Sequence, residues 1–246
     1  DDAPITTLQF FAVWEAIEAV SATPTIGLRI ASVLEGAVMP LAFVAAYHAR
    51  DFRDALQRVA RFKRLCALED ILLTESSARG EIVIHWPHAG TAVAPRSLVD
   101  ATLVSFVELG RSGTGEPLVP LKVELSRPEA SRQELEGYFG CQVTFNSKVN
   151  RITFRQEDLD KRFTTYNKDL LDVLAPELDR RLESHAASES VAEQTRWVLR
   201  RRLTAGRPDI RSVATELAMS ERSLQRRLTD EGFSFQTLVS ETRHQM

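Results

Sequence analysis

Residues 209–243 read DIRSVATELAMSERSLQRRLTDEGFSFQTLVSETR, which contains two short helical patterns close together. Asp209 can cap the start of the first helix, Ser220 can cap the second, and Gly232 can end it. The turn between them is short, at residues 218–220. Two short helices joined by such a turn are typical of a helix-turn-helix unit. The stretch therefore predicts an all-α domain in this part of the chain.

The second of these helices is expected to have an apolar face and a polar face. Leu224 and Leu228 lie four residues apart, so they share the face that we expect to be buried. Arg222, Gln225 and Arg226 are placed on the other side. Arginine can donate two hydrogen bonds to guanine, and glutamine can pair with adenine in the major groove. We therefore predict that these three side chains contact bases of double-stranded DNA.

Three further residues of this helix and its cap are expected near phosphates. Ser220 and Ser223 lie at the helix start, where backbone N–H groups without a helical partner can bind anions. Arg227 points away from the other two arginines, and we expect a phosphate contact or a surface charge. Two alternatives stay open: the exposed arginines belong to a protein-binding module, or they are only surface charges on a solvated helix.

Charge is divided unevenly along the chain. The whole sequence has a formal net charge of −3, but residues 190–246 contain 10 arginines and 7 acidic residues. Residues 1–189 contain 21 basic and 27 acidic residues. An excess of arginine in one region is consistent with DNA binding there, because its planar guanidinium forms paired hydrogen bonds.

Residues 1–183 mix helical and strand patterns, which predicts an α+β domain. Helical patterns cover residues 8–20, 25–64 with a break near Pro40, 97–109, 131–139 and 159–182. Strand patterns cover residues 71–73, 82–86, 121–125, 142–145 and 151–154. We expect a hairpin turn at Arg79-Gly80, and a helix end at Gly110. Residues 184–190 are small and polar and are predicted to be a linker, followed by the helical domain at 191–246.

No residue pattern indicates catalysis, a metal site or a cofactor. Cys66 and Cys141 are too few for a disulfide framework and are expected to be reduced thiols. His85 and His88 have the spacing of a metal pair, but Pro87 and the lack of neighbouring ligands make packing the better interpretation. No apolar run is long enough for a membrane span. Reduced thiols are typical of the cytoplasm, so we expect a cytoplasmic protein.

The quoted stretch resembles the first half of the DNA-binding domain of AraC/XylS-type transcription regulators. The resemblance rests on Ile210, Val213, Ala214, Leu217, Met219, Ser220, Arg222, Leu224, Gln225, Arg226, Leu228, Gly232, Ser234, Phe235, Leu238, Val239 and Arg243. It implies that the second helix is a recognition helix. The family's domain has a second helix-turn-helix after a connecting helix, and we expect Met246 to fall within that connecting helix, with the second unit absent.

Three upstream segments resemble the arabinose-binding-like N-terminal domain of one subgroup of this family, namely residues 27–31, 56–62 and 138–145. This resemblance implies a small-molecule effector of unidentified chemistry, or dimerisation. A homodimer is expected because paired half-sites multiply affinity, and RNA polymerase is a further candidate partner. The competing hypotheses are a ligand-binding or enzymatic domain with a helical tail that binds no DNA, and a protein-interaction adaptor.

Overall fold

In a computed structural model, the chain divides into two compact units, Asp1–Asp179 and Arg180–Met246. The structure describes residues 5–33, 40–66, 69–86, 89, 92–188, 190–203 and 208–244. The boundary between the units falls within helix α8 (Lys168–Ser188).

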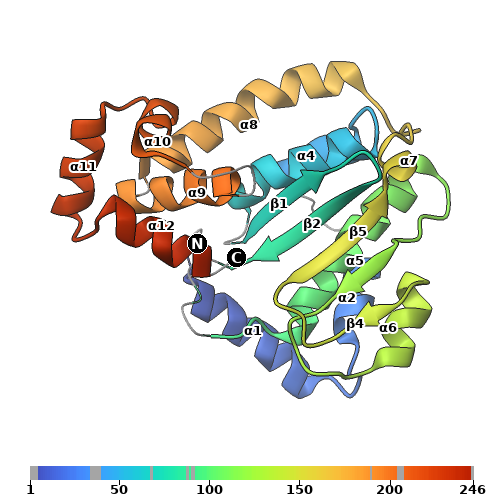
Figure 1. Ribbon diagram of the computed structural model, residues 1–246. Helices are drawn as coiled ribbons and strands as arrows, with labels where there is room; N and C mark the ends of the chain where they lie inside the picture. Colours follow the sequence, from blue (N-terminus) through green and yellow to red (C-terminus); the bar gives the residue numbers. More distant parts are fainter. Residues whose placement is uncertain are drawn as a thin grey trace. The chain divides into compact units, whose positions relative to one another are not determined.

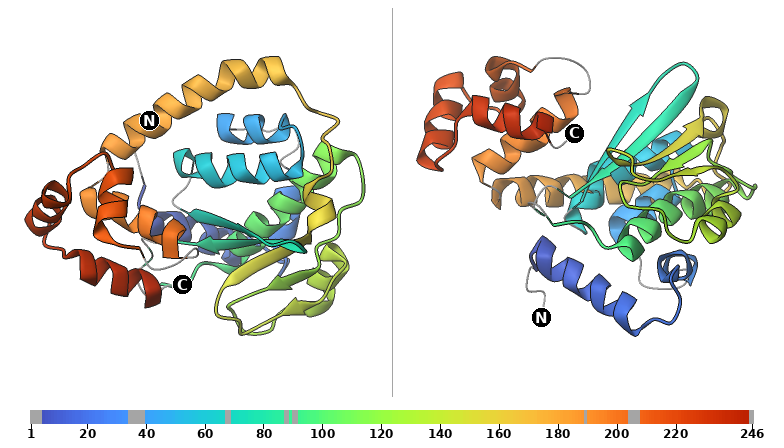
Figure 2. Two further views of the ribbon diagram at one scale, coloured as in Figure 1. Left: turned by 45° about the horizontal axis from the view of Figure 1, so that its top comes forward. Right: turned by 60° about the horizontal axis from the view of Figure 1, so that its bottom comes forward.

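The first unit contains a five-stranded sheet in the order β1-β2-β5-β3-β4 (Figure 1). Its strands are β1 (Asp70–Glu75), β2 (Arg79–His85), β3 (Lys122–Glu124), β4 (Val143–Thr144) and β5 (Asn150–Arg155). Neighbouring strands are antiparallel except for β3 and β4, which are parallel. The strands are twisted relative to one another, as the two views of Figure 2 show. The mixed helix and strand content that we expected is confirmed.

Helices account for most of the rest of the first unit. They are α1 (Thr7–Val20), α2 (Ile26–Val33), α3 (Leu41–Tyr47), α4 (Phe52–Phe62), the 3-10 turn η1 (Lys63–Leu65), α5 (Arg96–Thr114), α6 (Arg132–Phe139), α7 (Gln156–Leu159) and α8. Gly140, which directly follows the helical pattern at residues 131–139, ends α6 in the left-handed conformation with φ of 71°.

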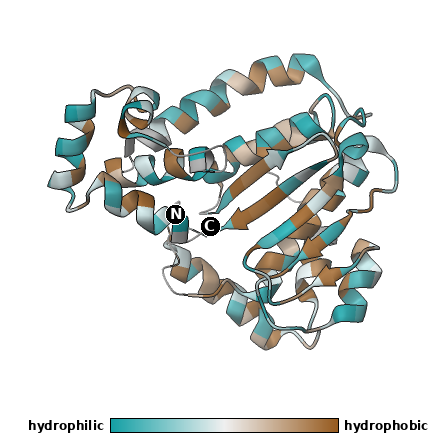
Figure 3. Ribbon diagram, viewed as in Figure 1, coloured by the Kyte–Doolittle hydropathy of each residue, from teal (hydrophilic) through white to brown (hydrophobic). Residues whose placement is uncertain are grey.

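One face of the sheet is the centre of the hydrophobic core. Ile82 pairs with Ile152 in register, and both are fully buried. Phe52 of α4 packs edge-on against Phe154 of β5, with ring centroids 5.0 Å apart. Apolar residues predominate in β1 and β2, which are largely brown in Figure 3. The alternation of buried residues along β2 explains why its strand pattern was visible in the sequence.

The prediction that a helix ends at Gly110 is wrong. Helix α5 continues to Thr114, and the residue that ends it is Gly115, with φ of 71°. A Cβ on Gly110 would lie 2.9 Å from Leu118 and 3.1 Å from the ring of Phe52. Gly110 therefore serves close packing and not helix termination.

The hairpin turn lies three residues earlier than predicted. Arg79 and Gly80 belong to β2, and Gly80 pairs with Glu75 of β1, so the turn occupies residues 76–78. A Cβ on Gly80 would lie 2.5 Å from the side chain of Leu159. A larger residue at this position would therefore displace the side chain of Leu159, a contact that no local turn signal reveals.

Helix α8 differs from the prediction at both ends. It begins at Lys168 instead of residue 159 and continues through Ser188, so residues 184–188, expected in a linker, are helical. Alanines within this segment are strong helix formers. Residues 160–167 are not helical because their backbone pairs elsewhere: the N–H of Phe163 donates to the oxygen of Arg50, and the N–H of Asn167 to that of His48.

A buried carboxylate lies in the second turn of α5. Asp100 is 2% exposed, and the guanidinium of Arg127 lies 2.8 Å from its Oδ1. Burial raises the pKa of Asp100 to about 6. Arg127 and Arg96 oppose this rise in pKa, and Glu18 adds to it.

We expect Asp100 to make the first unit less stable as pH rises from about 4 to about 6. In this window the folded state keeps the proton that the unfolded state releases, so the free energy of unfolding falls with pH. A difference of two pKa units corresponds to about 3 kcal/mol. Urea unfolding between about pH 4 and 6 should give a free energy of unfolding whose slope against pH is more positive for Asp100→Asn than for the wild type, because the variant lacks the negative contribution of Asp100. Equal slopes in the two proteins would contradict the assignment.

Candidate nucleic-acid interface

The second unit has four helices beyond the end of α8 in its described part. They are α9 (Val191–Leu203), α10 (Ile210–Glu216), α11 (Glu221–Asp230) and α12 (Phe235–His244). Figure 1 shows α10 and α11 side by side. The apolar residues of the four helices form a separate hydrophobic core. Val213 of α10, Leu224 and Leu228 of α11, and Leu238 of α12 contribute to it.

The turn between α10 and α11 is tight. Asp209 caps α10 by accepting a hydrogen bond from the N–H of Ser212 at 2.7 Å. Ala218 adopts a left-handed conformation with φ of 52°, which costs a residue with a Cβ roughly 1–2 kcal/mol. The N–H of Met219 reaches back to the oxygen of Ala214 at 2.8 Å, which satisfies the end of α10. This geometry fixes the direction in which α11 begins.

Ser220 and Ser223 are brought together at the start of α11. The hydroxyl oxygen of Ser220 accepts from the N–H of Ser223 at 3.1 Å, which is the N-cap interaction that the sequence predicts. The two hydroxyl groups are also hydrogen-bonded, at 2.9 Å. The first N–H groups of a helix have no partner inside it and carry partial positive charge. This end of α11 can therefore receive a phosphate.

The predicted base-contacting residues lie on the exposed surface of α11. Leu224 and Leu228 are fully buried, which fixes the opposite side of the helix in the core. Arg222 and Arg226 are exposed and lie one turn apart, so they form one stripe. Gln225 is also exposed.

Arg227 is exposed too, and it lies about 100° around the helix from Arg226. Other arginines of this unit are held by carboxylates: Arg196 contacts Glu193 and Glu241, and Arg202 contacts Glu216.

In the described part of the chain, by contrast, no ion pair or side-chain hydrogen bond engages Arg222, Arg226 or Arg227. Their charges are therefore available to a partner.

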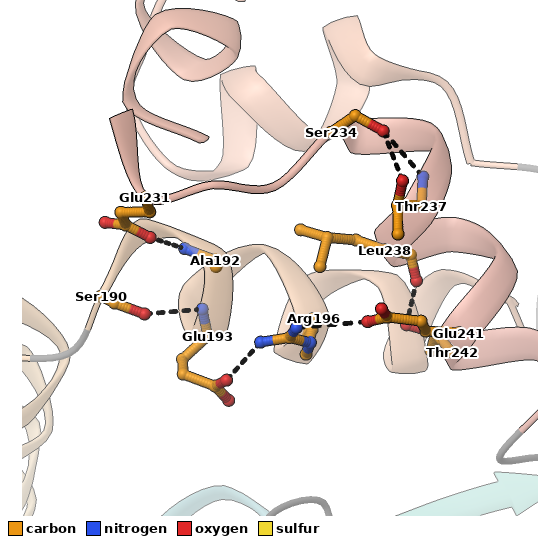
Figure 4. Close-up of polar contacts among 10 residues, drawn as sticks. All are labelled: Ser190, Ala192, Glu193, Arg196, Glu231, Ser234, Thr237, Leu238, Glu241 and Thr242. Carbon is orange, nitrogen blue, oxygen red and sulfur yellow. Dashed lines mark hydrogen bonds and ion pairs between the residues drawn. The ribbon is translucent and has the colours of Figure 1, made fainter. Parts of the chain in front are cut away.

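One contact within this unit was missed by sequence reasoning. The carboxylate of Glu231 accepts hydrogen bonds from the N–H groups of Val191 and Ala192, at 2.8 and 2.7 Å. Figure 4 shows Glu231 over the start of α9, where the hydroxyl oxygen of Ser190 accepts a hydrogen bond from the N–H of Glu193. The only signal in the sequence is an acidic residue before Gly232, and its partner is 40 residues away.

Residues 1–163 match the family described as the arabinose-binding domain of AraC transcription regulators, N-terminal. The chain belongs to this family of AraC-type regulators. The matched residues lie in the first unit, so the family assignment does not test the roles of residues in α11.

Two relatives of this AraC-type chain are known regulators. The ornithine utilization regulator of Pseudomonas aeruginosa is 22% identical over 243 residues, covering 97% of this chain and 70% of the relative. The crystal structure of the transcriptional regulator CdpR from Pseudomonas aeruginosa has a TM-score of 0.55 and 20% identity, covering 98% of this chain and 78% of that one. At this identity the second likeness concerns the fold alone.

The cysteines, the possible metal ligands and the helix lengths of the AraC-type chain bear on other kinds of site. Both cysteines are free, and burial raises the pKa of Cys141 to about 11, which keeps this thiol protonated at neutral pH. Among the described residues, no group of three or more histidine, cysteine, aspartate or glutamate side chains could hold a metal ion. His88 lies outside the described residues. None of the helices that the structure describes has the length and apolarity to cross a membrane.

Proposed function

We propose that this AraC-type protein is a sequence-specific DNA-binding transcription regulator, active at promoters in the bacterial cytoplasm. In this proposal α10 and α11 are a helix-turn-helix, and α11 is the recognition helix. The observation that carries it is the exposed group of Arg222, Gln225 and Arg226, in which neither arginine forms an ion pair within the described chain. The buried opposite face of α11 supports it, because a reading helix must be held rigidly.

The residues of α11 divide between two tasks. Arg222, Gln225 and Arg226 would contact base edges in the major groove. The first turn of the helix with its serines, Ser220 and Ser223, would bind one phosphate, and Arg227 another. Phosphate contacts determine position and much of the affinity, whereas base contacts determine sequence preference.

We further propose that residues 1–183 sense a small molecule and form a homodimer, and that residues 191–246 bind DNA. The family description names arabinose, the name of one relative refers to ornithine utilization, and these words belong to those proteins. A symmetric dimer would engage two half-sites and thereby raise both affinity and specificity. RNA polymerase is the partner through which occupancy of a promoter would change transcription.

The test is binding of genomic DNA fragments by the full-length protein, compared with Arg226→Ala at two salt concentrations. The wild type should enrich particular fragments, with an affinity that falls steeply as salt rises. Loss of one base contact should cost roughly 1–3 kcal/mol and relax the preference at one position of the site. Absence of enrichment by a folded protein, with and without candidate effectors, would reject the proposal.

Arg227→Ala is the matched comparison, because it removes the same charge from the same helix. It should weaken binding to all sequences to a similar extent. It should also reduce the slope of log affinity against log salt concentration by about 1, because one phosphate contact is lost. A protein-interaction adaptor would show neither effect, because its partner affinity would not follow the phosphate contacts.

A further inference from the structure

Glu231 occupies the junction between two helices of the second unit. Its backbone ends α11: the N–H of Glu231 donates to the oxygen of Arg227 at 3.1 Å. Gly232 follows with φ of 82°, and the N–H of Phe233 returns to the oxygen of Leu228 at 2.8 Å. The side chain of the same residue ends on α9 (Figure 4). One residue therefore joins the end of α11 to the start of α9.

The chemistry of this junction is well matched. The first N–H groups of α9 have no partner inside the helix. Ser190 satisfies that of Glu193, with 3.2 Å between Oγ and N. The two oxygens of Glu231 satisfy those of Val191 and Ala192, one each. A carboxylate is also favoured at this end of a helix by the helix dipole.

Two hydrogen bonds to one carboxylate add a directional restraint to the apolar packing of α11. Leu224 and Leu228 hold α11 in the core, but burial is not directional. Side chains reach about 5–6 Å from the helix axis, so a rotation of about 20° would move them by about 2 Å. A hydrogen bond to a base tolerates only a few tenths of an ångström, since its usual range is about 2.7–3.2 Å.

We propose that Glu231 is a positioning residue, whose carboxylate fixes the orientation of α11 against the N-terminus of α9. We call the two hydrogen bonds that Glu231 accepts from the N–H groups of Val191 and Ala192 the clamp. Its consequence for DNA reading rests on the proposed function, but the clamp itself does not. Ser190 directly precedes Val191, the first residue of α9. The clamp therefore makes the orientation of α11 depend on the position of the N-terminus of α9.

The test compares full-length Glu231→Gln with the wild type and with Glu216→Gln. The glutamine variant keeps the shape of the side chain and loses the charge and one acceptor oxygen. Glu216→Gln makes the same charge change on α10, where the carboxylate pairs with Arg202 at 2.8 Å. Two quantities are measured: hydrogen exchange of backbone amides, and the ratio of affinities for an enriched fragment and for unrelated DNA.

Glu231→Gln should lower the affinity ratio by about tenfold, as expected when a base contact is misplaced. Affinity for unrelated DNA should stay unchanged, and exchange should accelerate at residues 191–192 and in α11. Glu216→Gln should change none of these. Faster exchange in all four helices with an unchanged ratio would overturn the proposal, because the carboxylate would then only stabilise the unit. An unchanged exchange rate at residues 191–192 and in α11 would overturn it as well.

The exchange measurement separates this proposal from the proposed function. If the wild type enriches no DNA, the proposed function fails and exchange alone decides. Acceleration confined to residues 191–192 and α11 then supports the clamp, whereas uniform acceleration or none overturns it.

Discussion

Replacing Leu228 with alanine is expected to unfold the second unit while the first unit stays folded. Leu228 is fully buried in a small core that includes Leu224 and Leu238. Truncation of a buried leucine costs about 2–5 kcal/mol, through lost burial and the cavity that remains. A unit of this size has a total stability of roughly 3–10 kcal/mol, so the loss is comparable with the whole. The cores of the two units have no described residue in common, so unfolding should remain local.

Hydrogen exchange followed by mass spectrometry measures this directly. Amides of α9 to α12 should lose protection in Leu228→Ala, and those of α4 and β5 should keep it. Thr229→Ala is the control, because Thr229 is the exposed neighbour of Leu228 and such surface changes usually stay within about 0.5 kcal/mol. Retained protection in α11 of Leu228→Ala would mean that the core of the second unit is more robust than its packing indicates.

Interactions that are local in sequence could be predicted. Asp209 and Ser220 cap their helices through N–H groups three residues away, and Gly140 ends α6 within one turn. The exposed side of α11 was predictable for the same reason, because the spacing of Leu224 and Leu228 alone determines it.

Interactions between distant segments could not be predicted. In the sequence alone Gly110 has the features of a helix end, and only the structure shows that Phe52 packs against it. Residues 160–167 have a helical pattern, but their backbone forms hydrogen bonds with residues 48–52 instead. Glu231 belongs to this second class. Its local neighbourhood indicates an ordinary helix end, and only the folded unit shows which N–H groups its carboxylate meets.

The crossing of α2 and α5 provides the second large expected effect. A Cβ on Gly27 would lie 2.3 Å from the carbonyl oxygen of Ser97 and 2.9 Å from the Cβ of Asp100. The first of these atoms belongs to the backbone of α5, so a rotamer change cannot relieve the clash and the helices must separate. Overpacking of this kind costs about 1–3 kcal/mol or more, and we expect Gly27→Ala at or above the upper end of that range.

Gly137→Ala is the matched substitution with the opposite expected sign. Gly137 lies within α6, and apart from its chain neighbours and the nearby backbone of the helix itself, no heavy atom lies within 4 Å of the position of its Cβ. Alanine there should stabilise the first unit by roughly 0.5–1 kcal/mol, because glycine loses more backbone entropy in a helix. Urea midpoints should therefore move in opposite directions for the two variants. If both moved upward, helix propensity would outweigh the clash at Gly27, and α2 would have to cross α5 at a greater distance than the structure shows.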